Sequence, residues 1–240
     1  MRCGCKNATQ LLDVILKMKL KINDSYTISD IALSDKAAYI EHFQEKQIYL
    51  QTLAIPFPYT EADADWWINN NIEATKNQDG RSVNWAIRQS HDDYLIGGIG
   101  FHGHKIGKSH KAELGYWLAK PYWNKGIMTE AVKKTTEYGF KELGLTRVTA
   151  HVFDFNIGSA KVLEKSGYQF EGLLRNHYKK DGKIFSGKLY AVILEDFKKS
   201  VTDTTRPDFI KHYLEIQNEE NPPRFNNGDH DGVPDKGSGK

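Results

Sequence analysis

Ten residues in the middle of the chain, Trp123-Asn-Lys-Gly-Ile-Met-Thr-Glu-Ala-Val132, have the composition of a phosphate-binding turn. Gly126 permits a tight turn with unusual dihedral angles, and no helix breaker follows it, so a helix begins directly. The first N–H groups of a helix have no partner within it, and the positive end of the helix dipole lies among them. The segment therefore predicts a site for an anionic group, most simply a phosphate.

Other reactive side chains stand in patterns that make no site by themselves. Cys3 and Cys5 are the only cysteines, too few for a four-ligand zinc site or a disulfide framework. His102, His104 and His110 share one polar stretch, but no cysteine or carboxylate completes a metal set there. We therefore expect no metal.

The composition indicates an ordinary hydrophobic core and a nearly balanced charge. The chain has 240 residues, of which 39% are hydrophobic, with 33 basic and 31 acidic side chains. Nonspecific nucleic-acid binding normally needs a basic excess, so no nucleic-acid partner is expected. No stretch approaches the roughly 20 apolar residues of a membrane span, and the apolar run at Leu11 is interrupted by Asp13. We expect a soluble, cytoplasmic protein with no membrane partner.

The pattern around the turn predicts a mixed α/β fold. Helices are expected at residues 33–43, 60–72, 129–143 and 157–166, and strands at 26–31, 82–88, 94–101, 112–118, 147–153, 168–174 and 188–194. Ser34 and Thr60 are candidate caps, and Gly144 and Gly167 candidate stops. Two strand–helix–strand units favour parallel pairing, and the three-strand meander favours antiparallel pairing. The prediction is a strongly twisted central sheet of about seven strands with flanking helices.

Three segments together resemble one known family. The run from Glu113 to Ala131 is similar to the acetyl-CoA signature of the GCN5-related N-acetyltransferases (the GNAT superfamily), most of all its RimJ/RimL-like protein N-acetyltransferases. The run from Asn156 to Gly172 is similar to that family's second cofactor-side motif, and the loop from Pro56 to Thr60 also fits. The resemblance implies the GNAT fold and acetyl-CoA as the acyl donor.

The resemblance covers residues 20–198 and sets the expected domain boundaries. We expect an N-terminal extension at residues 1–19, an N-acetyltransferase domain at 20–200 and a disordered tail at 201–240. The tail segment contains few large apolar side chains, which is typical of disorder.

In this family the phosphate at the turn is the pyrophosphate of coenzyme A. Backbone N–H groups of residues 124–129 can replace its water without loss of side-chain entropy. The resemblance implies acetyl-CoA contacts for Leu118, Asn124, Lys125, Gly126, Ile127, Met128, Thr129 and Asn156. Trp123 stands where the family often has Gln or Arg, and Met128 where a small residue is common. Asn156 and Ser159 also suit a helix start, so capping is an alternative explanation for both.

Acetyl transfer to an amine requires alignment, hydrogen bonds to the developing oxyanion and a path for protons. Leu118 ends the strand before the turn, so its backbone is a candidate oxyanion donor. Glu113 matches a position where related acetyltransferases often carry a glutamate that acts through water, which implies a general base. A solvated carboxylate, or one paired with Lys111, is the alternative.

The family's usual tyrosine acid matches Leu163 in this chain, so the proton for the leaving thiolate must come from elsewhere. Ser159 is a candidate, directly or through water, as proposed for some RimL-like members. Tyr190 on the last strand is a further candidate catalytic residue, although packing is the commoner role of a half-buried strand tyrosine.

The resemblance implies an N-acetyltransferase that acts in a ternary complex, with a protein or peptide N-terminal α-amine as acceptor. One alternative acceptor is a small amine, such as a polyamine, aminoglycoside or amino acid. The acidic residues Glu61, Asp63 and Asp65 near the expected acceptor loop would suit a polycation, or simply complement a helix dipole. Another alternative, consistent with Leu163, is a module that binds acyl-CoA without turnover. Both a monomer and a homodimer are compatible with the sequence.

Overall fold

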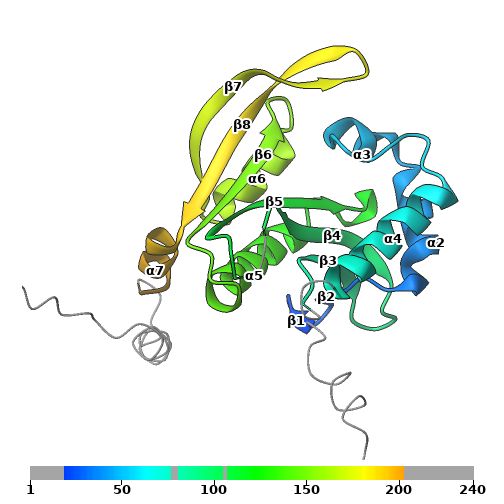
Figure 1. The fold of residues 1–240 in the computed structure, drawn as a ribbon, viewed down its shortest axis with the longest axis horizontal. Helices are drawn as coiled ribbons and strands as arrows, with labels where there is room; N and C mark the ends of the chain where they lie inside the picture. Colours follow the sequence, from blue (N-terminus) through cyan, green and yellow to red (C-terminus); the bar gives the residue numbers. More distant parts are fainter. Residues whose placement is uncertain (1–18, 77–80, 105–106, 203–240) are drawn as a thin grey trace, which may run out of the picture. The chain divides into compact units, whose positions relative to one another are not determined.

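The computed structural model describes residues 19–76, 81–104 and 107–202, which fold around one mixed β-sheet with helices on both faces (Figure 1). Apart from residue 19 and residues 201–202, the expected extension at 1–19 and the expected tail at 201–240 lie outside the described residues. The sheet order is β1-β2-β3-β4-β5-β6-β8-β7. Only β5 and β6 pair in parallel, and every other neighbouring pair is antiparallel. The predicted mixed α/β sheet is therefore confirmed.

The helices and strands expected from the sequence occur in the expected order. The strands are β1 Lys19–Lys21, β2 Tyr26–Asp30, β3 Asn84–Gln89, β4 Leu95–His102, β5 Lys111–Leu118, β6 Arg147–Phe153, β7 Gln169–Lys180 and β8 Lys183–Ile193. The helices are α2 Lys36–Phe43, α3 Lys46–Gln51, α4 Glu61–Lys76, α5 Ile127–Glu142, α6 Ile157–Lys165 and α7 Leu194–Thr202, with short 3-10 turns η1 Leu33–Asp35 and η2 Lys120–Tyr122.

Local capping was predicted correctly at some helix ends and wrongly at one. Thr60 precedes α4, where its Oγ accepts the Asp63 N–H at 3.2 Å and its own N–H donates to the Asp63 carboxylate at 2.8 Å. Ser34 does not cap its helix, because it lies inside η1 and Asp35 occupies the N-cap position of α2. Asp35 is placed there by long-range contacts, since its carboxylate binds the buried Arg88 guanidinium.

The two strands that flank the turn separate along their length. β5 pairs with β6 only over three positions, ending at Glu113 opposite Thr149. Beyond that point β5 continues to pair with β4, and β6 continues to pair with β8. The sheet therefore splits in its middle, and the rest of β5 faces a gap. Figure 1 shows the two strands diverging, with β6 running upward beside β8 and β5 running to the right beside β4.

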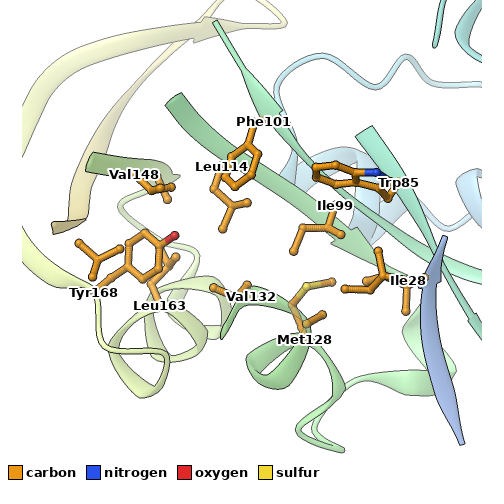
Figure 2. Packing of buried hydrophobic residues seen from close by; sticks show 14 of the residues in the cluster. Ile28, Trp85, Ile99, Phe101, Leu114, Met128, Val132, Val148, Leu163 and Tyr168 are labelled. Carbon is orange, nitrogen blue, oxygen red and sulfur yellow. The ribbon is translucent and has the colours of Figure 1, made fainter. Parts of the chain in front are cut away.

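Two apolar clusters hold the sheet from its two faces. One includes Leu114, Val132 and Leu163, from β5, α5 and α6 (Figure 2). The other includes Tyr39 and Ile68, from α2 and α4. Because side chains alternate along a strand, residues of β5 and β6 next to those of the first cluster face the α2/α4 side.

Candidate functional site

A cleft of about 1110 Å³ lies at the split in the sheet. Its lining comes from α2, α3, α4, from strands β3 to β7, from the turn before α5 and the first turn of that helix, and from α6. Among the lining residues are all eight that the sequence predicts for cofactor binding, namely Leu118, Asn124, Lys125, Gly126, Ile127, Met128, Thr129 and Asn156. Glu113 and Ser159 also line it, whereas Tyr190 does not.

The turn before α5 has the geometry of an anion cradle. Asn124 and Gly126 have positive φ angles of 60° and 75°, and Gly126 is the N-cap of α5. The first helical bond runs from the Glu130 N–H to the Gly126 carbonyl at 3.2 Å. The N–H groups before Glu130 are therefore the ones a helix leaves without an internal acceptor. A Cβ built on Gly126 would meet nothing within 4 Å, so the approach to these donors is open.

Three lysines add positive charge to the same cleft. Lys125 belongs to the turn, and Lys161 and Lys165 stand one helical turn apart on α6, so they share a face. Lys161 and Lys165 were not predicted from the sequence, although their spacing after Asn156 was a usable signal. Helix N–H groups and three ammonium groups suit a ligand that carries several phosphates, and coenzyme A is such a ligand.

The backbone of Leu118 faces the gap between β5 and β6. The Ala119 N–H donates to the Ile96 carbonyl at 2.8 Å, so this pair is hydrogen-bonded across β4 and β5. Because bonded and non-bonded pairs alternate in an antiparallel ladder, the Leu118 N–H and C=O point away from β4. The Trp123 indole N–H binds that carbonyl at 2.6 Å. Trp123 thus ties the turn to β5, and the Leu118 N–H is directed at the gap.

Asn156 caps α6 and orients Ser159. The Asn156 side chain accepts the Ser159 N–H at 3.0 Å, which is the capping interaction that the sequence left as an alternative. The Ser159 Oγ lies 2.8 Å from the hydroxyl of Tyr116 on β5. Burial raises the Tyr116 pKa above its usual range, so its hydroxyl is protonated at neutral pH. Tyr116 was not among the site residues predicted from the sequence.

Neither Leu163, which occupies the family's tyrosine position, nor the candidate Tyr190 lines the cleft. Leu163 is fully buried, with 0% exposure, in the cluster between the sheet, α5 and α6, so this position faces the core. Tyr190 is also buried, and its hydroxyl donates to the Glu164 carboxylate at 3.0 Å. Its ring lies against Phe170. The structure therefore places Tyr190 outside the cleft, in a packing contact.

Glu113 is paired with a histidine of the neighbouring strand. Its Oε1 lies 3.0 Å from Nδ1 of His151 on β6, and both residues line the cleft. The His151 ring stacks on that of His177 on β7, with centroids 5.9 Å apart and planes 16° from parallel. Burial, together with the nearby Glu113 charge, raises the Tyr178 pKa to about 12. Glu113 is therefore not a simple solvated carboxylate.

The split separates two polar pairs onto opposite faces of the sheet. Glu113 and His151 alternate with residues of the α5/α6 cluster, such as Leu114 and Val152, and therefore face the α2/α4 side. Tyr116 lies in phase with Leu114 and reaches Ser159 on the α5/α6 side. The gap thus has a carboxylate–imidazole pair on one face and a pair of hydroxyls on the other.

The three histidines of the loop region are separated in the structure. His102 lines the cleft and lies over Gly115, where an added Cβ would come within 2.5 Å of its ring nitrogen. His104 is buried, and His110 bonds through Nδ1 to the Thr146 hydroxyl at 3.1 Å. Among the described residues, no group of three or more ligating side chains is placed to hold a metal ion.

At the end of the cleft that α3 lines, α3 and the β7–β8 hairpin contact each other. The Tyr49 hydroxyl donates to Asp181 at 2.5 Å. The Lys180 ammonium donates to the carbonyls of Tyr49 and Thr52 and lies 3.7 Å from the Tyr49 ring centroid. In Figure 1 the hairpin tip reaches toward α3. The sequence predicted neither α3 nor this contact.

The acidic residues near this end are already paired. Lys36 lies 3.3 Å from Glu61 and 2.9 Å from Asp65. Asp63 accepts the Thr60 N–H and hydroxyl, which lowers its pKa. The remaining lining on this side is largely apolar or aromatic and includes Ile48, Leu53, Ile55, Pro56, Trp66 and Trp67.

The described part of the chain contains no helix that is both long and apolar enough to cross a membrane.

A split sheet with an exposed helix start, and with a carboxylate–imidazole pair and two hydroxyls beside the gap, suits group transfer from a phosphate-bearing donor. A family model described as "Acetyltransferase (GNAT) domain" matches residues 26–169, more than half of the chain. The chain therefore belongs to the GNAT acetyltransferase family. GNAT acetyltransferases take their acetyl group from acetyl-CoA, and the turn and lysines fit that donor.

Individual relatives agree with the family assignment. The chain is 36% identical over 116 residues to the uncharacterized N-acetyltransferase YoaA of Bacillus subtilis (strain 168), a match covering 48% of this chain and 65% of YoaA. It thus spans just under two thirds of that relative. A GNAT-family acetyltransferase from Bacillus anthracis is 26% identical with a TM-score of 0.64, covering 74% of this chain and 99% of that one. The ribosomal-protein-S5-alanine acetyltransferase from Vibrio fischeri shares the fold at 23% identity and a TM-score of 0.65, covering 75% and 98%.

Proposed function

We propose that the protein is an acetyl-CoA-dependent N-acetyltransferase of the RimJ/RimL-like type, which acetylates the N-terminal α-amine of a protein or peptide. The observation that carries this proposal is the convergence of three features on one cleft. These are the helix start at Gly126 with its lysines, the Leu118 N–H in the gap, and the pairs Glu113–His151 and Tyr116–Ser159 beside it.

Each group has a defined task in the proposed reaction. The N–H groups of the first turn of α5, with Lys125, Lys161 and Lys165, hold the pyrophosphate end of the donor. Bound acetyl-CoA supplies an acetyl group activated as a thioester. The Leu118 N–H donates to the oxygen on which negative charge develops.

Protons leave and enter on opposite faces of the gap. Glu113, with His151, removes the proton from the attacking amine on the α2/α4 face. Ser159, supported by the protonated Tyr116 hydroxyl, returns a proton to the leaving sulfur on the α5/α6 face. This division places the acceptor on the α2/α4 face and the donor sulfur toward α6.

Transfer proceeds by direct attack in a ternary complex. The described lining of the cleft contains no cysteine that could carry the acetyl group covalently. Both substrates must then be bound together, and the enzyme contributes mainly alignment and electrostatic stabilisation.

The lining supports a peptide chain end over a polycation as acceptor. Glu61 and Asp65 share an ion pair with Lys36 and do not line the cleft, so of this acidic cluster only Asp63 is available in the lining to a polyamine or aminoglycoside. The apolar and aromatic wall suits the side chains of the first residues of a peptide. The likeness in fold to the Vibrio fischeri acetyltransferase supports the same acceptor class. A ribosomal or other newly made protein as acceptor would place the reaction in the cytoplasm.

A matched set of acceptors tests the acceptor class. The first acceptor is a peptide with a free α-amine and no lysine. The second peptide differs from it only in a blocked α-amine and one internal lysine. Spermidine represents polycations. We expect CoA release with the first peptide, at a kcat/KM at least about tenfold above the other two, a difference of about 1.4 kcal/mol. A preference for spermidine would instead establish the small-amine alternative.

A further inference from the structure

We propose that His151 is the catalytic residue that accepts the proton of the attacking amine, and that Glu113 is a positioning residue that holds its imidazole ring. This inference rests on the proposed function and divides the work within the pair that the structure brings together. It departs from the expectation that Glu113 itself is the base.

The contact between the two side chains selects one form of the imidazole. Glu113 Oε1 lies 3.0 Å from Nδ1 of His151, and a carboxylate only accepts hydrogen bonds. The nearby carboxylate favours a proton on Nδ1 over a lone pair there, and a neutral ring in that form has its lone pair on Nε2. Among the described residues, the contacts of the His151 ring are with Glu113 through Nδ1 and with the face of His177, which leaves Nε2 without a hydrogen-bond partner there. The accessible basic atom of the pair is then a nitrogen.

The surroundings of His151 hold its ring in one plane. His177 of β7 stacks on the ring, and Tyr178 packs edge-on against His177 at 4.7 Å between centroids. Leu189 of β8 stands opposite His151 in the ladder and is apolar. From β4, His102 stands opposite Glu113. The charged and titratable neighbours are therefore Glu113, His102, His177 and Tyr178.

The exposed fractions of the His151 and Glu113 side chains suit a base and a positioning residue, respectively. The His151 side chain is 21% exposed, and the Glu113 side chain is 45% exposed. His151 is thus shielded yet still reachable from the cleft, which it lines. It also sits on β6 two residues past Thr149, where the parallel pairing with β5 ends. That position is at the edge of the gap into which the Leu118 N–H points.

The chemistry of the step balances with an imidazole base. The amine nitrogen forms its bond to the acetyl carbon, and its surplus proton passes to Nε2 of His151. The Glu113 carboxylate stays ionised and stabilises the resulting imidazolium. The carbon–sulfur bond breaks, the sulfur receives a proton through Ser159, and His151 returns its proton to solvent. In model peptides imidazole titrates near about 6.5 and a glutamate carboxyl near about 4.3, so imidazole is the better match to neutral pH.

Nitrogen NMR of the free protein gives a test that needs no turnover. The ring nitrogen shifts of His151, assigned by comparison with His151→Gln, should show the Nδ1–H form in the wild type. In Glu113→Leu, which has no acceptor, that preference should disappear. A wild-type ring protonated at Nε2 instead would remove the lone pair from the cleft and overturn the proposal.

Kinetics of two glutamate variants separate a positioning role from a base. Glu113→Gln keeps an acceptor oxygen for Nδ1–H but removes the charge, whereas Glu113→Leu removes both. If Glu113 positions His151, the Gln variant should retain at least about ten times the kcat of the Leu variant, a difference of about 1.4 kcal/mol in activation free energy. If Glu113 is the base, both variants should be equally impaired, and the proposal fails.

The pH profile of His151→Gln supplies the decisive comparison. We expect kcat to fall by roughly 10²–10⁴-fold and the acid limb of the wild-type kcat/KM profile to disappear. His91→Gln, an exposed histidine outside the cleft, is the matched control and should keep both the wild-type kcat and the wild-type limb. An acid limb that is unchanged in His151→Gln would contradict the assignment.

The two levels of inference fail in different ways. If the wild type binds acetyl-CoA but releases no CoA with any amine, the proposed function is wrong. If the wild type acetylates peptides and His151→Gln does so equally well, the function stands and the base assignment is wrong.

Discussion

The hydroxyl of Tyr116 lies 2.8 Å from Oγ of Ser159, and this contact links β5 to α6 across the gap in the sheet. The two residues are 43 positions apart in the sequence. The family resemblance implies a tyrosine acid on α6, at the position that Leu163 occupies in this chain. Leu163 is buried in the core. The structure instead brings a tyrosine of β5 to the same helix.

The Tyr116–Ser159 contact predicts a selective loss of turnover in Tyr116→Phe. Removing the hydroxyl leaves Ser159 without its partner, so we expect kcat to fall by roughly tenfold to a hundredfold with little change in acetyl-CoA affinity. Steady-state kinetics and calorimetry measure the two quantities. Tyr168→Phe is the control, because it also loses a buried hydroxyl contact, to Thr136, outside the cleft. Equal kcat in both variants would refute a role for Tyr116.

The turn before α5 predicts a specific effect of Gly126→Ala on donor binding. A side chain at a φ of 75° costs about 1–2 kcal/mol, and relaxing this strain turns the N–H groups away from the phosphates. We expect acetyl-CoA to bind at least about tenfold more weakly. Gly167→Ala carries a similar strain, at a φ of 88°, but lies outside the cleft. If the two variants lose affinity equally, the turn is not the phosphate site.

The lysines of α6 predict a salt-dependent donor affinity. The double variant Lys161→Gln/Lys165→Gln should weaken acetyl-CoA binding by roughly tenfold at 0.1 M salt, and the difference should shrink at about 1 M, where charges are screened within about 3 Å. The control Lys133→Gln/Lys134→Gln removes the same charge from α5 outside the cleft lining. Equal loss in both pairs, measured by titration calorimetry, would argue against a direct phosphate contact.

The buried His104 predicts a loss of stability in acid. Burial lowers its pKa in the folded protein, so the unfolded chain takes up a proton that the folded one resists. Stability is therefore full above the ordinary value of 6.5 and falls as the pH drops through the lower folded-state pKa. In His104→Leu this part of the pH dependence should be absent. Urea unfolding at pH 7.5 and 5.5 measures it, and an unchanged difference between the two pH values would contradict the prediction.

Features set by short-range sequence were predictable. The turn at Gly126, the start of α5 and the stops at Gly144 and Gly167 depend on neighbouring residues, and all three glycines have positive φ angles. Six of the eight predicted cofactor residues, Asn124 to Thr129, belong to that turn or to the first turn of α5, and all eight line the cleft.

Features set by long-range pairing were not predictable in the same way. Glu113 and His151 meet because β5 and β6 pair in parallel, and no local sequence pattern predicts the register of that pairing. The short helix α3 is held by contacts of Tyr49 with the hairpin, as its six residues have little intrinsic stability. Ser34 was a reasonable cap by composition, but the buried Arg88 placed Asp35 there instead.

The most direct test of the central claim is acetyl transfer itself. Purified protein is incubated with acetyl-CoA and a peptide library with free N termini, released CoA is measured, and mass spectrometry locates the acetyl group. Our account predicts CoA release in equal amount to peptides acetylated at the α-amine, with rates that saturate in both substrates. Tight binding of acetyl-CoA without CoA release, with any peptide or small amine, would contradict it and identify an acyl-CoA-binding module instead.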